Sequence, residues 1–243
     1  MLCYKAWRES QTRFVLSALT IAGLCVLFVL FQNEARTGFD GGPPTYVGYI
    51  WRIVYKGYVR ELYVLLVLLL GVGGLVRERA YGTAGFTLAL PVSRWRLVAA
   101  RAVIGLSQAA ILSLLPALVI PVLSPFVQES YPWTQAIQFS LLWTVGGTLV
   151  FAMAFLASVI FGGEYSAPVV AFVVLLVYSA IADMPMLDRF DIHDMMSGTG
   201  TPYFRLDASL ITGPLPWMAI AVILLVSCCM FVLAGRITQA QDF

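Results

Sequence analysis

Six long stretches without charged residues constrain the fold of this chain more than any other feature of its sequence. They cover residues 14–31, 62–76, 102–128, 130–163, 165–182 and 208–235. Crossing the hydrocarbon core of a membrane takes about 20 residues of α-helix. Only 12% of the 243 residues are charged and 60% are hydrophobic, whereas about a quarter of the residues of a soluble domain are charged. The sequence therefore predicts a single all-α integral membrane domain over residues 1–243.

Six transmembrane helices are expected, at about residues 14–31, 57–76, 97–121, 137–161, 165–183 and 215–235. The second uncharged stretch is short, so its helix is expected to begin further back, around Ile53, with Arg60 and Glu61 near the outer headgroups. The first stretch could be a signal peptide, because basic residues precede it. It is longer than the apolar region of such peptides and lacks a small-residue cleavage site, which favours a retained helix.

The distribution of charges predicts which side each segment faces. With the N-terminus inside, the inner segments hold nine Lys/Arg and four Asp/Glu, and the outer ones hold six and nine. Basic residues that flank spans are retained on the inner side. We therefore expect a multi-pass protein of the cytoplasmic (inner) membrane, with both termini cytoplasmic and no nucleic-acid partner. No cysteine lies in an expected outer loop, so no disulfide is predicted.

Residues 1–13 are too polar to insert into a membrane. Tyr4, Trp7 and Phe14 fall near one helical face, and Lys5 and Arg8 lie on another. This pattern predicts an interfacial helix on the inner membrane surface. The alternative is a basic flank to the first span.

An outer insert is expected at residues 184–214, before the last span. His193 is the only histidine of the chain and lies between Asp191 and Asp194. That spacing matches no standard set of metal ligands, and one histidine without a cysteine or a second histidine is a weak signal. We expect a solvated acidic segment and no metal.

Motifs for nucleotide hydrolysis and for catalysis are missing from the sequence. It contains no GxxxxGK[ST] phosphate loop, no HExxH and no GxSxG. The expected span interiors carry essentially no charges, which argues against an ion-coupled carrier. The chain is therefore expected to have no catalytic residues and no cofactor, and any transport would need a partner to drive it.

The most basic stretch of the chain is residues 77–101, between the second and third expected spans. It contains five arginines against the single acid Glu78. Thr83 can cap a short helix, Pro91 must end that helix, and Ser93 can cap the next one. The stretch is thus expected to form a short helix, a corner and the start of a membrane helix, on the cytoplasmic side.

Two parts of this stretch resemble a motif of ABC-2-type transporter permeases. They read RERAYGT at residues 77–83 and LALPVSR at residues 88–94. The family motif is similar to E-R-E-x-G-T-L-E-x-L-L-x-x-P-V-S-R in order and spacing. The chain departs from it at Gly85, where an acidic residue often follows Gly-Thr. Beyond the motif, the similarity is one of layout.

The resemblance implies a cytoplasmic coupling segment at residues 77–96 that contacts a separate ATP-binding subunit. The docking positions carried over are Arg77, Glu78, Arg79, Gly82, Thr83, Leu90, Pro91 and Arg94. It further implies that two copies of the chain form the pathway, as a homodimer above two ATPase subunits. ATP and magnesium would be bound by those subunits, so the chain itself is not expected to be an enzyme.

Apolar and aromatic spans favour an apolar or amphipathic substrate for an exporter of this kind. Phe139, Trp143, Phe151 and Phe155 could line its path or could face lipid. The competing class is a non-transporting membrane protein, such as an immunity protein, a scaffold or an intramembrane enzyme. A further alternative is an ABC complex that serves the maturation of an extracytoplasmic enzyme.

Overall fold

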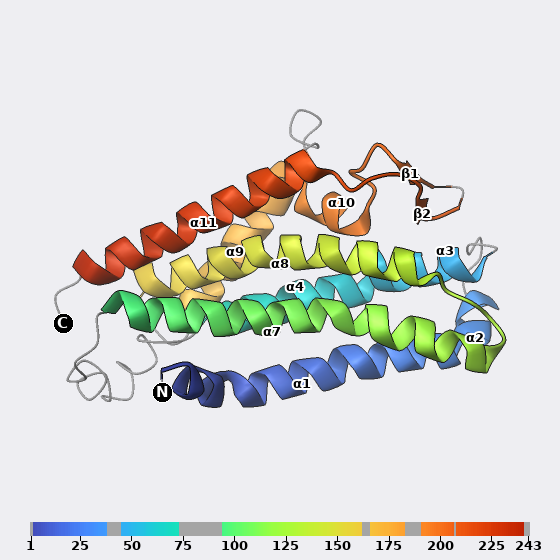
Figure 1. The fold of residues 1–243 in the computed structure, drawn as a ribbon, viewed down its shortest axis with the longest axis horizontal. Coiled ribbons are helices and arrows are strands. Elements are labelled where there is room, and N and C mark those ends of the chain that lie inside the picture. The colour runs from blue at the N-terminus through green and yellow to red at the C-terminus, as the bar shows by residue number, and fades with distance from the viewer. Residues whose placement is uncertain are drawn as a thin grey trace.

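The computed structural model describes residues 2–37, 45–72, 94–161, 166–182, 191–206 and 208–240. These residues form an elongated helical bundle with one short β-hairpin (Figure 1). The helices are α1 (Leu2–Leu30), α2 (Gln32–Thr37), α3 (Tyr46–Ile50), the π-helix η1 (Trp51–Tyr55), α4 (Tyr58–Gly71), α7 (Arg94–Leu123), the 3₁₀-helix η2 (Ser124–Val127), α8 (Trp133–Ile160), α9 (Ser166–Ala182), α10 (Ile192–Ser197) and α11 (Trp217–Ala240). Strands β1 (Phe204–Arg205) and β2 (Leu210–Ile211) pair antiparallel.

Four helices in the described part of the chain are long and apolar enough to cross a membrane. They span Leu2–Leu30, Trp95–Val127, Trp133–Ile160 and Trp217–Ala240. The chain is therefore a multi-pass, all-α membrane protein. The other two expected spans coincide with α4 and α9, which have 14 and 17 residues. The count of six spans stays a prediction.

The helical run that contains α4 begins earlier than the sequence suggested. It starts at Tyr46, passes through the π-helix η1, and is interrupted between Lys56 and Tyr58. A Cβ at Gly57 would lie 2.6 Å from the Arg52 carbonyl oxygen, so a larger residue does not fit this interruption. The expected start near Ile53 falls inside η1.

Helix α8 is the centre of the bundle. It packs against α7, α11, α4, α9 and α10, and it is the most buried of the four long helices. Tyr63 of α4 is fully buried beside it and donates its hydroxyl to the carbonyl oxygens of Trp143 (3.1 Å) and Ala109 (3.3 Å). The backbones of α7 and α8 therefore both contact Tyr63. The absence of a side chain at Gly147 leaves space for the Tyr63 hydroxyl.

Helix α1 is continuous from Leu2 to Leu30. Its first turns contact α7, because Arg101 pairs with Glu9 at 3.2 Å and Gln108 donates to the Ser10 hydroxyl at 2.8 Å. Residues 2–13 thus continue into the first span without the break that a separate interfacial helix would need. Their position relative to a membrane surface stays a prediction.

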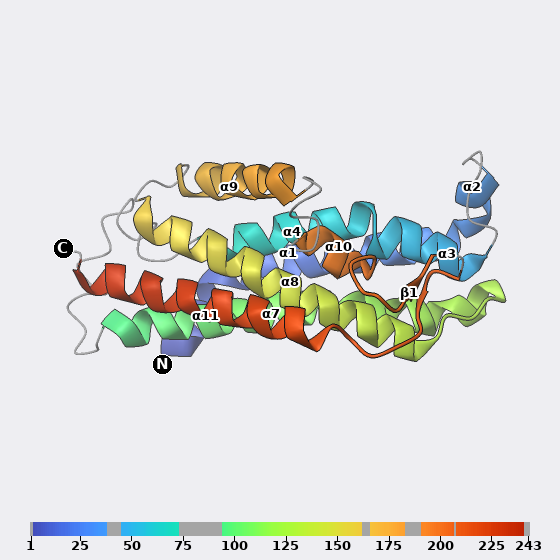
Figure 2. The same ribbon diagram turned by 90° about the horizontal axis from the view of Figure 1, so that it is seen from above.

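The start of α1, the start of α7 and the end of α11 lie toward one end of the bundle, and α4 runs toward this end and stops short of it (Figures 1 and 2). Helices α2 and α3 and the β-hairpin lie toward the other end. Helix α4 runs between α9 and α1 when the bundle is seen from above (Figure 2). The side of the membrane that each end faces stays a prediction.

We predict that Gly147→Ala destabilises the protein relative to Gly23→Ala. The Cβ at 147 would overlap the Tyr63 hydroxyl, whereas a Cβ at 23 has no atom within 4 Å. Both variants gain the same helix propensity, so the difference in their free energies of unfolding measures the overlap, expected at roughly 1–3 kcal/mol. Reversible unfolding in mixed micelles measures it. Equal stabilities would mean that the helices can separate here without cost.

Candidate functional site: a polar cluster between α4, α9 and α10

Arg60 and Glu61 lie in the first turn of α4, where Arg60 is buried, at 8% exposed, and the Glu61 side chain is largely exposed. Arg60 Nη1 donates to the backbone oxygen of His193 at 2.8 Å, and its Nε donates to Glu61 Oε1 at 3.2 Å. Its Nη2 also donates to Glu61 Oε1. Arg60 is therefore buried within the chain. The expected depth of both residues, near the outer headgroups, stays a prediction. The buried guanidinium is stable here because a carboxylate and a carbonyl oxygen satisfy it.

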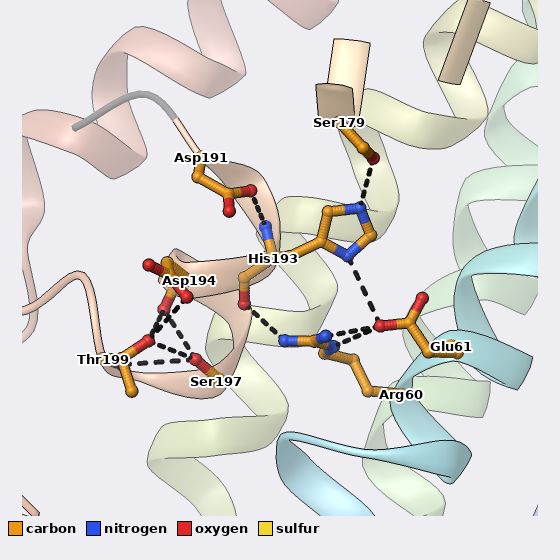
Figure 3. Close-up of polar contacts among 8 residues, drawn as sticks. All are labelled: Arg60, Glu61, Ser179, Asp191, His193, Asp194, Ser197 and Thr199. Carbon is orange, nitrogen blue, oxygen red and sulfur yellow. Dashed lines mark hydrogen bonds and ion pairs between the residues drawn. The ribbon is translucent and has the colours of Figure 1, made fainter. Parts of the chain in front are cut away.

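His193 connects this pair to α9 (Figure 3). Its Nε2 lies 3.0 Å from Ser179 Oγ, and its Nδ1 lies 3.7 Å from Glu61 Oε1. The tautomer with the proton on Nδ1 suits both neighbours, because Nε2 then accepts from the serine hydroxyl and Nδ1–H points at the carboxylate. Arg60, Glu61, Ser179 and His193 are called the polar cluster below.

Helix α10 brings His193 into place. Asp191 caps it by accepting from the His193 backbone N–H at 2.7 Å, and the Ile192 N–H donates to the Tyr178 hydroxyl at 3.1 Å. At its other end, Trp51 Nε1 donates to the Ser197 oxygen at 2.9 Å. Helices α4 and α9 and the π-helix η1 therefore all hold this short helix by hydrogen bonds.

The apolar face of α10 is buried in the bundle. Met196 and Ile192 pack against Gly146, midway along α8, where a Cβ would overlap Met196. Met195 and Met196 are 6% and 0% exposed. The expectation of a solvated acidic segment is therefore wrong for residues 191–197. Aspartates at the start of α10 cap and brace it, while its hydrophobic residues face α8.

The polar cluster contains a serine, a histidine and a carboxylate in the spatial sequence of a catalytic triad. His193 lies between Ser179 and Glu61, as the base lies between the nucleophile and the acid in such triads. Two features limit the cluster as a hydrolase. Ser179 lies inside α9, where helical hydrogen bonds use the neighbouring backbone N–H groups. Glu61 Oε1 also receives two donors from Arg60, which compete with His193. The main effect of the cluster is therefore structural, because it joins α4, α9 and α10.

Most of the docking positions that the sequence predicted lie outside the described residues. These are Arg77, Glu78, Arg79, Gly82, Thr83, Leu90 and Pro91, together with Gly85. Arg94 is the first residue of α7. Their role in coupling stays a prediction.

The four aromatic residues predicted along the fourth span all lie on α8 and face the interior of the chain. Phe139 stacks on Tyr55 with ring centroids 4.7 Å apart, and Trp143 stacks on Tyr63 at 5.1 Å. Phe151 and Phe155 stack on each other at 5.9 Å. None is more than 6% exposed, so they form core packing within one chain and do not face lipid. Their part in a pathway stays a prediction.

A cavity of about 380 Å³ opens between α1, α4 and α9 near the end of α4. It is lined mainly by apolar side chains, and its residues are Arg13, Leu16, Ser17, Thr20, Leu66, Leu69, Leu70, Val72 and Pro168. Arg13 donates to the backbone oxygens of Leu69 (3.3 Å) and Val72 (2.8 Å), which satisfies carbonyl groups at the end of α4. The cavity therefore combines apolar walls with a polar strip along α1.

The fold and the polar cluster define a class, a multi-pass helical membrane protein with a buried arginine inside its bundle. A scan against protein-family models finds no match for the sequence, and a search of curated proteins finds none either.

We predict that Arg60→Met lowers the free energy of unfolding by about 2 kcal/mol, because it leaves Glu61 and the His193 oxygen without their donor. Arg205→Met, on the exposed strand β1, is the matched control and is expected to have little effect. Chemical unfolding in mixed micelles measures both. If the two variants lose the same stability, the Arg60 contacts do not hold α10.

Proposed function

We propose that the chain is the membrane permease subunit of an ABC-type exporter in the cytoplasmic membrane. A separate ATP-binding subunit supplies the work, and two copies of the chain form the pathway for an apolar or amphipathic substrate. The observation that carries this proposal is the RERAYGT and LALPVSR sequence between α4 and α7. Of the helices on its two sides, α7 begins at one end of the bundle and α4 runs toward that end (Figure 1).

The contacts around this end support a mechanical role. Arg13 of α1 bonds to the end of α4, and Glu9 of α1 pairs with Arg101 near the start of α7. A push on residues 77–94 therefore reaches α4, α7 and α1 together. In the proposed cycle, ATP-driven closure of the partner moves this segment, and the bundle transmits the movement toward the polar cluster.

We predict that Arg79→Glu and Arg94→Glu each lower the recovery of an ATP-binding protein with the tagged chain at least tenfold, which is about 1.4 kcal/mol of binding. Arg205→Glu reverses a charge on the β-hairpin, toward the other end of the bundle, and should leave recovery unchanged. Purification from membranes in mild detergent, followed by quantification of the bound ATPase, measures this. The proposal fails if the wild-type chain recovers no ATP-binding protein, or if both reversals leave recovery and ATP-driven transport intact.

An intramembrane enzyme is the second candidate, and the order Ser179, His193, Glu61 is the observation in its favour. A fluorophosphonate probe, which labels activated serines, separates the two candidates. Under the transport proposal we expect no labelling of the purified chain above that of Ser179→Ala, with Ser227→Ala of α11 as the control. Labelling that Ser179→Ala alone removes would favour the enzyme.

A further inference from the structure

One face of α4 is left open along its whole length. Glu61, Leu65 and Leu69 recur every four residues and are exposed, at 53% for the Glu61 side chain and 41% and 44% for the two leucines. The opposite face, with Tyr63 and Val67, is fully buried against the bundle. The open face lies between α1 and α9, because Leu69 lines the cavity that those two helices share with α4.

The carboxylate of Glu61 gives this face a charged outer end. Both Arg60 donors converge on Oε1, which is also the oxygen nearest His193 Nδ1. Among the described residues, Oε2 has no hydrogen-bond or ion-pair partner. The Arg60 side chain is only 10% exposed, so a molecule approaching from outside the bundle meets the carboxylate before the guanidinium. Oε2 is therefore free to accept a hydrogen bond from a ligand.

The inner end of the face leads into apolar space. Leu69 lies two turns beyond Glu61, which is about 12 Å along the helix axis. From there the cavity of about 380 Å³ continues between Leu16 of α1 and Leu66 and Leu70 of α4. This volume lies within the range of small-molecule sites, about 300–1,000 Å³. Arg13 also lines the cavity and already donates to the backbone oxygens of Leu69 and Val72.

We propose that this face is a binding site for an elongated cationic amphiphile. Its protonated amine donates to Glu61 Oε2, its apolar body lies along Leu65 and Leu69, and its end enters the cavity beside Leu66. Glu61 Oε2 selects the amine at this end of the face, because it can accept from an N–H donor and would repel an anionic headgroup. The binding site itself lies within one chain and does not depend on the proposed export function. Only the statement that the bound molecule is the exported substrate rests on that function.

The test uses the purified full-length chain in nanodiscs of phosphatidylcholine, without any ATPase. The probe is dodecane-1,12-diamine carrying a dansyl group on one nitrogen, and its N-acetylated form is the uncharged counterpart. We expect the wild-type chain to bind the amine at least tenfold more tightly than the acetylated form. Glu61→Gln should remove that preference and leave the affinity for the acetylated form unchanged. Glu34→Gln on α2 should behave as wild type.

Leu65→Trp is the second variant, because it fills the open face without removing any contact of Arg60 or Glu61. It should weaken both probes at least tenfold while the thermal unfolding midpoint stays that of wild type. The proposal is wrong if wild type binds both probes equally, if Glu61→Gln keeps the preference for the amine, or if Leu65→Trp binds as wild type. It is also wrong if excess phosphatidylcholine displaces the amine and the acetylated probe equally, since the face would then hold only lipid.

The outcomes for binding and for export are separable. If the wild-type chain does not prefer the amine but an ATP-binding protein still copurifies with it, only the proposed site is wrong. Amine binding without any ATP-binding partner would overturn the export proposal and leave the site intact.

Discussion

Burial of α8 on most of its sides is the constraint on which the rest of the structure depends. Its small residues let large neighbours approach, since Gly147 makes room for Tyr63 and Gly146 for Met196. Its large residues, such as Trp143 and Phe139, fill the space between the surrounding helices. Tyr63 also donates to backbone oxygens of α7 and α8, which is favourable where no water competes. The long helices α7 and α11 pack directly on α8, and α1 packs on α7 and α4.

The polar cluster follows from the same packing. Because α10 reaches the middle of α8 at Gly146, the backbone of His193 comes within hydrogen-bond distance of Arg60. The guanidinium then turns toward Glu61 and α10, and the second carboxylate oxygen is left on the open face of α4. Ionisable groups inside a membrane bundle are costly and commonly mark a functional site. The core packing of α8 thus places one charged oxygen beside the apolar face where we propose that a ligand binds.

Much of the architecture could be read from the sequence, and the exceptions have physical causes. The uncharged stretches predicted α1, α7, α8 and α11, because length and apolarity are properties of each segment alone. The burial of Arg60 could not be predicted in this way, since its partner His193 lies 133 residues away in the chain. The expected position of Arg60 and Glu61 near the outer headgroups stays a prediction.

Helix α10 left a local signal that its acidic residues obscured. Ile192, Met195 and Met196 follow the i, i+3, i+4 spacing of an amphipathic helix, and Asp191 is a standard N-cap residue. The prediction for residues 1–13 separated a polar helix from the first span, although no helix-breaking residue divides them. Contacts of Glu9 and Ser10 with α7 stabilise the polar turns as part of α1. The charged residues of positions 1–13 therefore do not mark a boundary within α1.

The central claim is that residues 77–94 receive force from an ATP-binding subunit. A cryo-EM map of the chain, purified with its partners from native membranes and trapped with a non-hydrolysable ATP analogue, tests it most directly. The account predicts two copies of the chain, each with residues 77–94 seated on an ATP-binding subunit at the end of the bundle where α7 begins. A chain without a nucleotide-binding partner, or with one bound only near α3 and the β-hairpin, would contradict it.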